Sequence, residues 1–166
     1  MSEKLPSSSR YAKALAVLRI YTGLAWCSHG FGKLASPQWA AQGGWFDTIL
    51  KNMSSNTSGP YHDFVYGFVL PHANVFAALV AWGESLTGIA LVLGLFTRLG
   101  GIGGAFLALN YWAAKGDYAN WNSIGALDLV HVALSLVNVA LPTGLVWGLD
   151  GLIAARKKAA TTGIKS

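Results

Sequence analysis

The chain has 166 residues, with 12 Lys or Arg against 7 Asp or Glu, which gives a formal net charge of +5. Only 11% of the residues are charged, against about 25% in soluble domains, and 53% are hydrophobic. This composition excludes an intrinsically disordered chain and argues against an ordinary water-soluble protein. The length is that of one domain, and the single cysteine, Cys27, excludes an internal disulfide framework.

Four apolar stretches predict membrane-spanning helices, at residues 11–31, 73–96, 99–114 and 123–141. At about 1.5 Å per residue the first two are long enough to cross a hydrocarbon core of about 30 Å. The third is short for a span, and the fourth is closed by Pro142-Thr143-Gly144, which is a turn signal. The sequence therefore predicts an all-α protein, an integral membrane four-helix bundle within one domain over residues 11–151.

Basic residues predict the orientation of this bundle. An even number of spans places residues 1–10, the N-terminal tail, on the same side as residues 152–166, a basic C-terminal tail. That side would hold Lys4, Arg10, Lys13, Arg98, Arg156, Lys157, Lys158 and Lys165, and the other side only Lys33, Lys51 and Lys115. The positive-inside rule then predicts a multi-pass protein of the inner (cytoplasmic) membrane with both termini in the cytoplasm.

The longest predicted connection is the outer loop, residues 32–71, which is too long for a simple turn. Ser36-Pro37 is typical of a helix start, and apolar residues from Trp45 to Met53 follow at helical spacing. The aromatic stretch Tyr61–Leu70 is too short to cross a membrane and is followed by Pro71. We expect short helical segments lying on the membrane surface, with Lys33 extending outward to that surface.

Two of the predicted spans carry residues at helical spacing that are expected to face other helices. Asp128, His131, Ser135 and Asn138 would share one helical face, which would pack against protein and not lipid. In the preceding span, Gly100 and Gly104 form a small-residue pattern that lets a neighbouring helix approach closely, so we expect them to be packing residues.

Five polar residues would lie near the middle of the membrane when helical rises are counted from the cytoplasmic ends. They are Arg19, Glu84, Asn110, Asp128 and His131. A lone charge at that depth costs about 2.5–3.5 kcal/mol on insertion scales, so we expect Arg19 to form a charge pair with Glu84 or else with Asp128. These groups are either structural, fixing helix register, or line a pocket for a polar or redox-active small molecule such as a quinone. In the second interpretation Arg19 would contact an anion, while Glu84, Asp128 or His131 would handle protons.

Other kinds of site receive less support from the sequence. His29 beside Cys27 is a poor metal site, so no metal is expected, although His29 or His131 as an axial ligand of a haem or pigment stays open. The basic C-terminal cluster is expected to meet anionic lipid and not nucleic acid. No intrinsic cofactor is expected.

Several short motifs together resemble the DoxX/DoxD family of four-helix membrane proteins. They are Arg19 with Gly23, His29-Gly30-Phe31-Gly32-Lys33-Leu34, Gly59-Pro60-Tyr61, Phe68-Val69-Leu70-Pro71-His72-Ala73, Gly83-Glu84, Gly88, Leu93-Gly94-Leu95-Phe96-Thr97-Arg98-Leu99, Asn110-Tyr111 and Gly148-Leu149-Asp150. The resemblance implies a membrane subunit of the thiosulfate:quinone oxidoreductase type, linked to quinone-dependent electron transfer from a reduced sulfur compound. In that picture Arg19 would meet thiosulfate or a quinone carbonyl, and Glu84 would orient it or relay a proton.

The resemblance also implies a partner redox subunit, because the chain carries no binding motif for flavin, an iron–sulfur cluster or covalent haem. The alternative is a non-catalytic accessory subunit that stabilises a larger bioenergetic or photosynthetic complex. The sequence leaves open whether the chain forms a homo-oligomer. A third function, small-solute transport, would require one.

Overall fold

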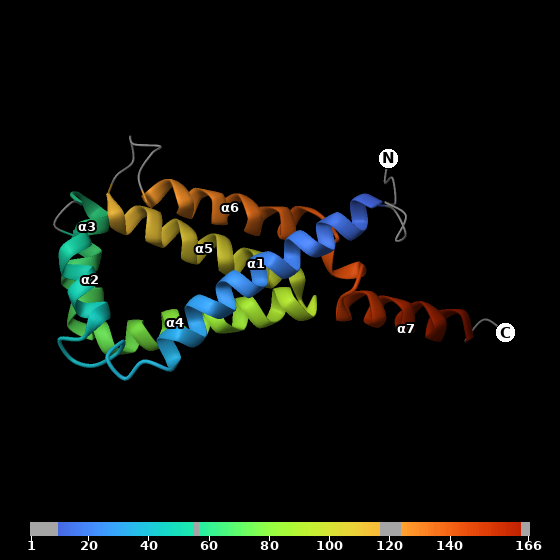
Figure 1. Cartoon of the computed structure of the whole chain (residues 1–166), viewed down its shortest axis with the longest axis horizontal. Coiled ribbons are helices and arrows are strands. Elements are labelled where there is room, and N and C mark those ends of the chain that lie inside the picture. Colours follow the sequence, from blue (N-terminus) through green and yellow to red (C-terminus); the bar gives the residue numbers. More distant parts are fainter. Residues whose placement is uncertain (1–9, 55–56, 117–123, 164–166) are drawn as a thin grey trace.

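The computed structural model describes residues 10–54, 57–116 and 124–163, and all regular secondary structure in these residues is helical. The long helices α1 (Arg10–Leu34), α4 (Ala73–Leu93), α5 (Thr97–Lys115) and α6 (Ile124–Ala140) follow the long axis of the molecule (Figure 1). The predicted all-α class is confirmed for the described residues. Residues 1–9 and 164–166 of the predicted tails, and Ser123 at the start of the fourth predicted span, lie outside them.

Close helix contacts depend on glycines. α1 packs along α4, α5 packs along α6, and α4 contacts α5. A Cβ atom added to Gly23 of α1 would lie 2.7 Å from the backbone nitrogen of Val92, and one added to Gly88 of α4 would lie 2.5 Å from that of Cys27. Any larger residue would therefore push α1 and α4 apart, whereas small residues let helices approach closely in membranes.

The predicted outer loop folds into short helical pieces. They are α2 (Trp45–Ser54), α3 (Pro60–Phe64), a π-helical turn η1 (Val65–Val69) and a 3-10 turn η2 (Leu70–His72). They stand across one end of the long helices in Figure 1, which we call the α2 end. The expected short helices are thus present, but the helix predicted to start at Ser36-Pro37 begins only at Trp45, because residues 36–44 form turns that include Gly43 at φ 68°.

A compact apolar core fixes these pieces to α4. It contains Trp39, Phe46, Leu50, Val65, Val69, Ala77 and Ala81. The Trp39 Nε1–H donates to the Ala77 carbonyl of α4 at 2.9 Å, and the Tyr61 hydroxyl donates to the Asn110 carbonyl of α5 at 3.2 Å. The α2 end is therefore covered by a packed layer joined to two long helices.

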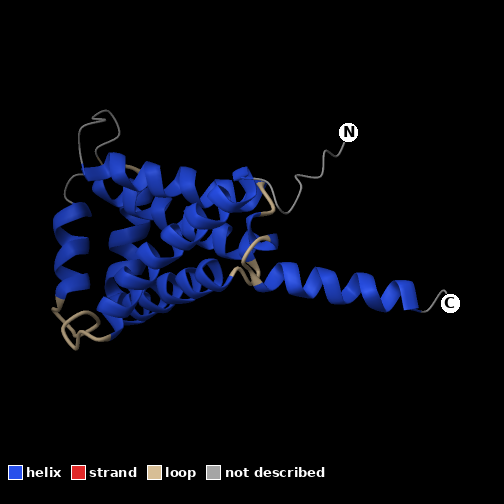
Figure 2. Cartoon of the chain, turned by 45° about the vertical axis from the view of Figure 1, so that its right-hand side comes forward, coloured by secondary structure: helices blue, strands red, loops and turns tan. Residues whose placement is uncertain are grey.

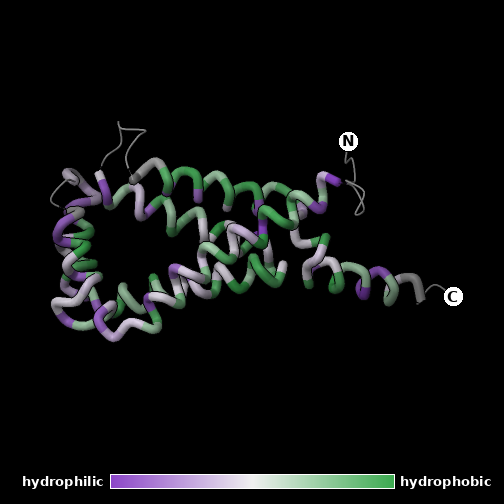
Figure 3. Tube along the Cα trace, viewed as in Figure 1, coloured by the Kyte–Doolittle hydropathy of each residue, from purple (hydrophilic) through white to green (hydrophobic). Residues whose placement is uncertain are grey.

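Within the described residues, one continuous helical run, Pro60–Leu93, is long and apolar enough to cross a membrane by length and composition, and Leu127–Ala140 is a shorter apolar helix. The second predicted span therefore receives direct support. The described part of the fourth predicted span is α6, whose 17 residues reach about 26 Å at the usual helical rise, and it ends at Ala140, one residue before the predicted end. Figure 3 shows apolar residues along the long helices and polar residues concentrated at the α2 end and on the C-terminal helix.

At the opposite end, the guanidinium of Arg19 is completely buried and binds backbone carbonyls. It donates to the carbonyl oxygens of Thr143 at 2.8 Å, Val146 at 3.2 Å and Trp147 at 2.8 Å. These carbonyls belong to the turn that contains the 3-10 helix η3 (Thr143–Leu145) and leads to α7 (Leu149–Gly163). Arg19 thus joins α1 to the segment between α6 and α7, and we call this group the Arg19 clamp.

Asp150 completes the clamp from the first turn of α7. Its carboxylate accepts hydrogen bonds from the N–H groups of Phe96 at 2.9 Å and Thr97 at 3.0 Å, and from the Thr97 hydroxyl at 2.6 Å. Burial alone would raise the pKa of the Asp150 carboxyl, but these hydrogen bonds and the positive charge of Arg19 hold that pKa below its usual range. The carboxylate therefore caps the start of α5 from another helix.

Beyond the clamp, α7 projects away from the other helices (Figure 2), and residues 152–161 are exposed. The predicted basic tail is therefore helical over most of its length. We call this end of the molecule the α7 end.

We expect Arg19→Met to destabilise the fold by on the order of 3 kcal/mol, because three backbone carbonyls lose a charged donor, two of them in buried hydrogen bonds. Thermal unfolding of the purified protein in detergent measures the change. Arg10→Met, at the exposed start of α1, is the matched control and should change stability by less than about 0.5 kcal/mol. Equal effects of the two substitutions would contradict the clamp.

The lowered pKa of Asp150 predicts how the clamp depends on pH. The carboxylate contributes stability above its unfolded pKa of about 3.9, and this contribution is lost as the pH falls through the lower folded value. The difference in melting temperature between wild type and Asp150→Asn should thus be largest near neutral pH and shrink below about pH 4. A difference that stays constant down to about pH 2 would contradict this role.

Candidate functional site

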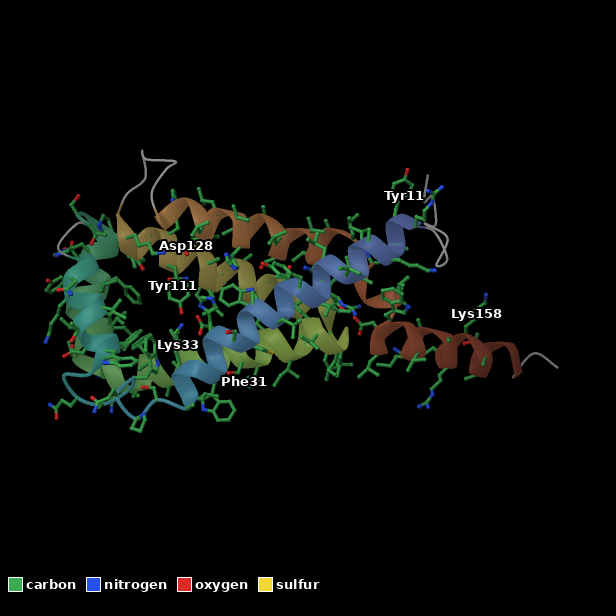
Figure 4. All side chains as sticks on the ribbon, in the orientation of Figure 1. Tyr11, Phe31, Lys33, Tyr111, Asp128 and Lys158 are labelled. Carbon is green, nitrogen blue, oxygen red and sulfur yellow. The ribbon has the colours of Figure 1, made fainter. Side chains whose placement is uncertain are left out.

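Three polar side chains from three helices meet toward the α2 end. Lys33 of α1 places its Nζ atom 2.5 Å from Oε1 of Glu84 in α4 and donates to the hydroxyl oxygen of Tyr111 in α5 at 2.8 Å. The Tyr111 hydroxyl donates in turn to the same Glu84 oxygen at 2.5 Å. We call Lys33, Glu84 and Tyr111 the Glu84 cluster, and Figure 4 shows Lys33 and Tyr111 facing each other.

Burial makes this cluster unusual. The Glu84 side chain is fully buried and the Lys33 side chain is 17% exposed. The Lys33 ammonium also lies 4.8 Å from the centre of the Trp39 ring, a cation–π contact that covers it from the α2 side. The second carboxylate oxygen of Glu84, Oε2, is buried without a hydrogen-bond partner in the structure. The carboxylate therefore has the capacity to accept one more proton or hydrogen bond.

Beside the cluster lies a cavity of about 50 Å³, bounded by α1, α5 and α6. It is lined by Ala25, Trp26, His29, Ala108, Tyr111, Asp128 and His131, and we call it the histidine cavity. The His131 ring lies edge-on to Trp26, with 5.7 Å between ring centres, and 6.4 Å from His29. Asp128 pairs with Lys115, with 2.6 Å between Oδ2 and Nζ. Tyr111 belongs both to this cavity and to the Glu84 cluster.

The predicted charge pair of Arg19 with Glu84 is wrong in this structure, and so is the alternative of Arg19 with Asp128. Side chains on a helix lean toward its N-terminus. Since α1 starts at the α7 end and α4 starts at the α2 end, Arg19 leans toward the first end and Glu84 toward the second. The same direction turns Lys33 back into the molecule, so the expectation that it extends to the outer surface is also wrong.

The other predicted site residues separate into two groups. Asp128 and His131 line the histidine cavity, and Glu84 contacts it through Tyr111. Asn110 does not line the cavity; its side-chain amide donates to the Phe106 carbonyl of its own helix at 2.8 Å. A Cβ atom on Gly100 would lie 3.2 Å from the Ala90 side chain of α4, whereas Gly104 faces α6 and α1.

Sequence reasoning missed Lys33, Tyr111, Trp26 and Lys115 as site residues, and it considered His29 only as an axial ligand of a haem or pigment. A signal for them exists, because one spacing of three and then four residues recurs on three helices. It gives Trp26, His29 and Lys33 on α1, then Ala108, Tyr111 and Lys115 on α5, then Asp128, His131 and Ser135 on α6. Each set marks one helical face, and the structure turns the three faces toward one another.

The cavity offers proton donors and acceptors more readily than metal ligands. Among the described residues, no group of three or more His, Cys, Asp or Glu side chains is arranged to hold a metal ion. The Asp128 carboxylate is already engaged by Lys115, while Tyr111 both accepts and donates a hydrogen bond. The site can therefore exchange protons between a buried carboxylate, a phenol and a neighbouring cavity.

Glu84→Gln should destabilise the protein by about 3–5 kcal/mol, because it leaves the Lys33 ammonium buried without a counter-charge. The double variant Lys33→Met/Glu84→Gln should recover a large part of this loss, as measured by unfolding in detergent. The control pair, Asp47 and Lys51, lies on α2 with 3.0 Å between Oδ2 and Nζ, and its Lys51 side chain is 56% exposed. Breaking that pair should cost less than about 1 kcal/mol. Strictly additive losses at Lys33 and Glu84 would rule out their coupling.

Comparison with known protein families supports the resemblance found in the sequence motifs. The family model for DoxX matches residues 14–115, a region that contains Lys33, Glu84 and Tyr111 but neither Asp128 nor His131. No curated protein and no solved structure matched the chain. Since the match covers more than half of the sequence, the chain belongs to the DoxX family, a family of membrane proteins.

Proposed function

We propose that this chain is a membrane subunit of a quinone-linked electron-transfer complex that takes electrons from a reduced sulfur compound such as thiosulfate. Its own residues would supply the protons that accompany those electrons. The observation that carries the proposal is the position of Tyr111, whose hydroxyl lies between the buried Glu84 carboxylate and the histidine cavity.

Proton transfer is the chemistry that this arrangement supports. Reduction of a quinone to a quinol consumes two electrons and two protons, so a site at membrane depth needs groups that bind and release protons. The Tyr111 hydroxyl accepts from Lys33 and donates to Glu84, so a proton can shift along this pair of hydrogen bonds. His131 and Asp128 line the same cavity, and an imidazole and a carboxylate can both accept and release protons.

The size of the histidine cavity limits what it can hold. Its volume of about 50 Å³ has room for a few water molecules, whereas an apolar cavity of about 150 Å³ is needed for benzene. The residues therefore fit a proton path and do not fit the ring of a quinone. We therefore propose that this cavity carries protons and does not hold the quinone ring.

The membrane arrangement that we propose is a bundle of α1, α4, α5 and α6, each spanning the bilayer. Large apolar side chains on all four point away from the protein interior, among them Tyr21, Trp82, Phe106 and Leu136, which are 50–66% exposed. Arg10, Lys13, Arg98, Arg156, Lys157 and Lys158 lie toward the α7 end or on α7. The positive-inside rule then favours a cytoplasmic α7 end in the inner membrane, with the α2 end on the outer side.

A partner subunit would supply the electrons, as in the oxidoreductases that the chain resembles. Removal of the gene and complementation in the native membrane provide the test. Membranes with the wild-type chain should reduce a short-chain ubiquinone analogue with thiosulfate as donor, and membranes without it should not. Tyr111→Phe should lower this rate by about 10²-fold, because it removes the hydroxyl that links Glu84 to the cavity.

Asp47→Asn on α2 serves as the matched control and should restore the full rate, since its partner is Lys51 on the surface. Full activity of Tyr111→Phe would overturn the proton role. Unchanged quinone reduction after removal of the gene, together with dissociation of a larger complex, would favour the accessory-subunit alternative.

A further inference from the structure

Two buried polar atoms without a hydrogen-bond partner lie next to the histidine cavity. Trp26 is 4% exposed and Ser135 is 0% exposed. The Trp26 Nε1–H and the Ser135 hydroxyl have no hydrogen-bond partner in the structure. An unsatisfied buried polar group costs about 1–3 kcal/mol, and native proteins rarely leave two such groups together.

Gly104 of α5 brings these two atoms to the same place. A Cβ atom added to Gly104 would lie 2.9 Å from Trp26 Nε1 and 2.6 Å from Ser135 Oγ. Both atoms therefore approach one point on α5 from two different helices. His131 and Ala108 line the cavity. Ser135 is one helical turn from His131, and Gly104 is one helical turn from Ala108. Ser135 and Gly104 thus lie about one helical turn beyond the residues that line the cavity, whereas Trp26 lines the cavity itself.

The chemistry of the surrounding groups identifies the ligand class. The indole N–H can only donate a hydrogen bond, and the serine hydroxyl can donate another, so both can be satisfied by one acceptor oxygen. His131 Nδ1 lies 2.9 Å from the Leu127 carbonyl, which can only accept, so Nδ1 carries the proton. In the neutral ring Nε2 is then an acceptor. Asp128 in the same cavity disfavours an anion.

We propose that Trp26 and Ser135 bind an internal water molecule beside Gly104, next to the histidine cavity. Its oxygen accepts hydrogen bonds from Trp26 and Ser135, and it donates its own protons toward His131, whose ring centre lies 5.7 Å from that of Trp26. A water needs two to four polar partners, which these three side chains provide. This inference deepens the proposed function, because it extends the proton path to the middle of the helices, but it concerns the resting protein and requires no turnover.

The direction in which Ser135→Ala shifts the melting temperature tests the water site. If Ser135 binds water, Ser135→Ala removes a hydrogen bond and should lower the melting temperature in detergent by about 2–4 °C. If the hydroxyl is simply unsatisfied, the same change should leave the melting temperature unchanged or raise it, which would overturn the proposal. Ser85→Ala is the matched control, since Ser85 is 1% exposed and its hydroxyl donates to the Ala81 carbonyl at 2.8 Å.

Nuclear magnetic resonance of ¹⁵N-labelled indole groups tests the water directly. The Trp26 signal is identified by its loss in Trp26→Phe and should show magnetisation transfer from water. The Trp39 N–H, which donates to the Ala77 carbonyl, is the control and should show none. Absence of transfer at Trp26 would overturn the proposal, including the case in which a co-purified organic carbonyl occupies the site. Loss of quinone reduction would leave both measurements unaffected, so the two proposals can fail separately.

Discussion

A buried charge needs an opposite charge or several hydrogen bonds, and this requirement organises the interior of the protein. The Glu84 carboxylate is fully buried and depends on Lys33 and Tyr111, while the equally buried Arg19 guanidinium depends on three backbone carbonyls. Burying either charge at that depth without its partners would cost several kcal/mol. These two groups tie α1 to α4 and α5 toward one end of the molecule and to the segment before α7 at the other.

Glycine at the helix contacts makes those partners reachable. Ser85 packs so closely against Gly30, and Cys27 against Gly88, that a Cβ atom added to either glycine would overlap its neighbour. α1 and α4 can therefore lie close enough for the Lys33 ammonium to contact Glu84 directly. On α5 the same principle applies at Gly104, where the missing side chain leaves room for Trp26 and Ser135. Packing and polar chemistry are thus set by the same small residues.

The sequence predicted much of the fold and less of the site. Apolar length gave the four long helices within a few residues, and the early end of α4 follows from Gly94 at φ 62°. Asp128 and His131 were recognised because polar residues on an apolar helix face are costly. Their partners were not, since depth counted along a helix ignores the direction in which a side chain leans. Arg19 and Glu84 have similar predicted depths yet lean apart on antiparallel helices.

The Arg19 clamp determines how α7 is attached to the other helices. The guanidinium binds the carbonyls just before this helix, and Asp150 in its first turn is bound to the start of α5. The base of α7 is therefore attached to both α1 and α5, so a force that tilts its exposed end would act on these two helices together. The same two helices carry Lys33 and Tyr111, whose side chains bind the buried Glu84 carboxylate.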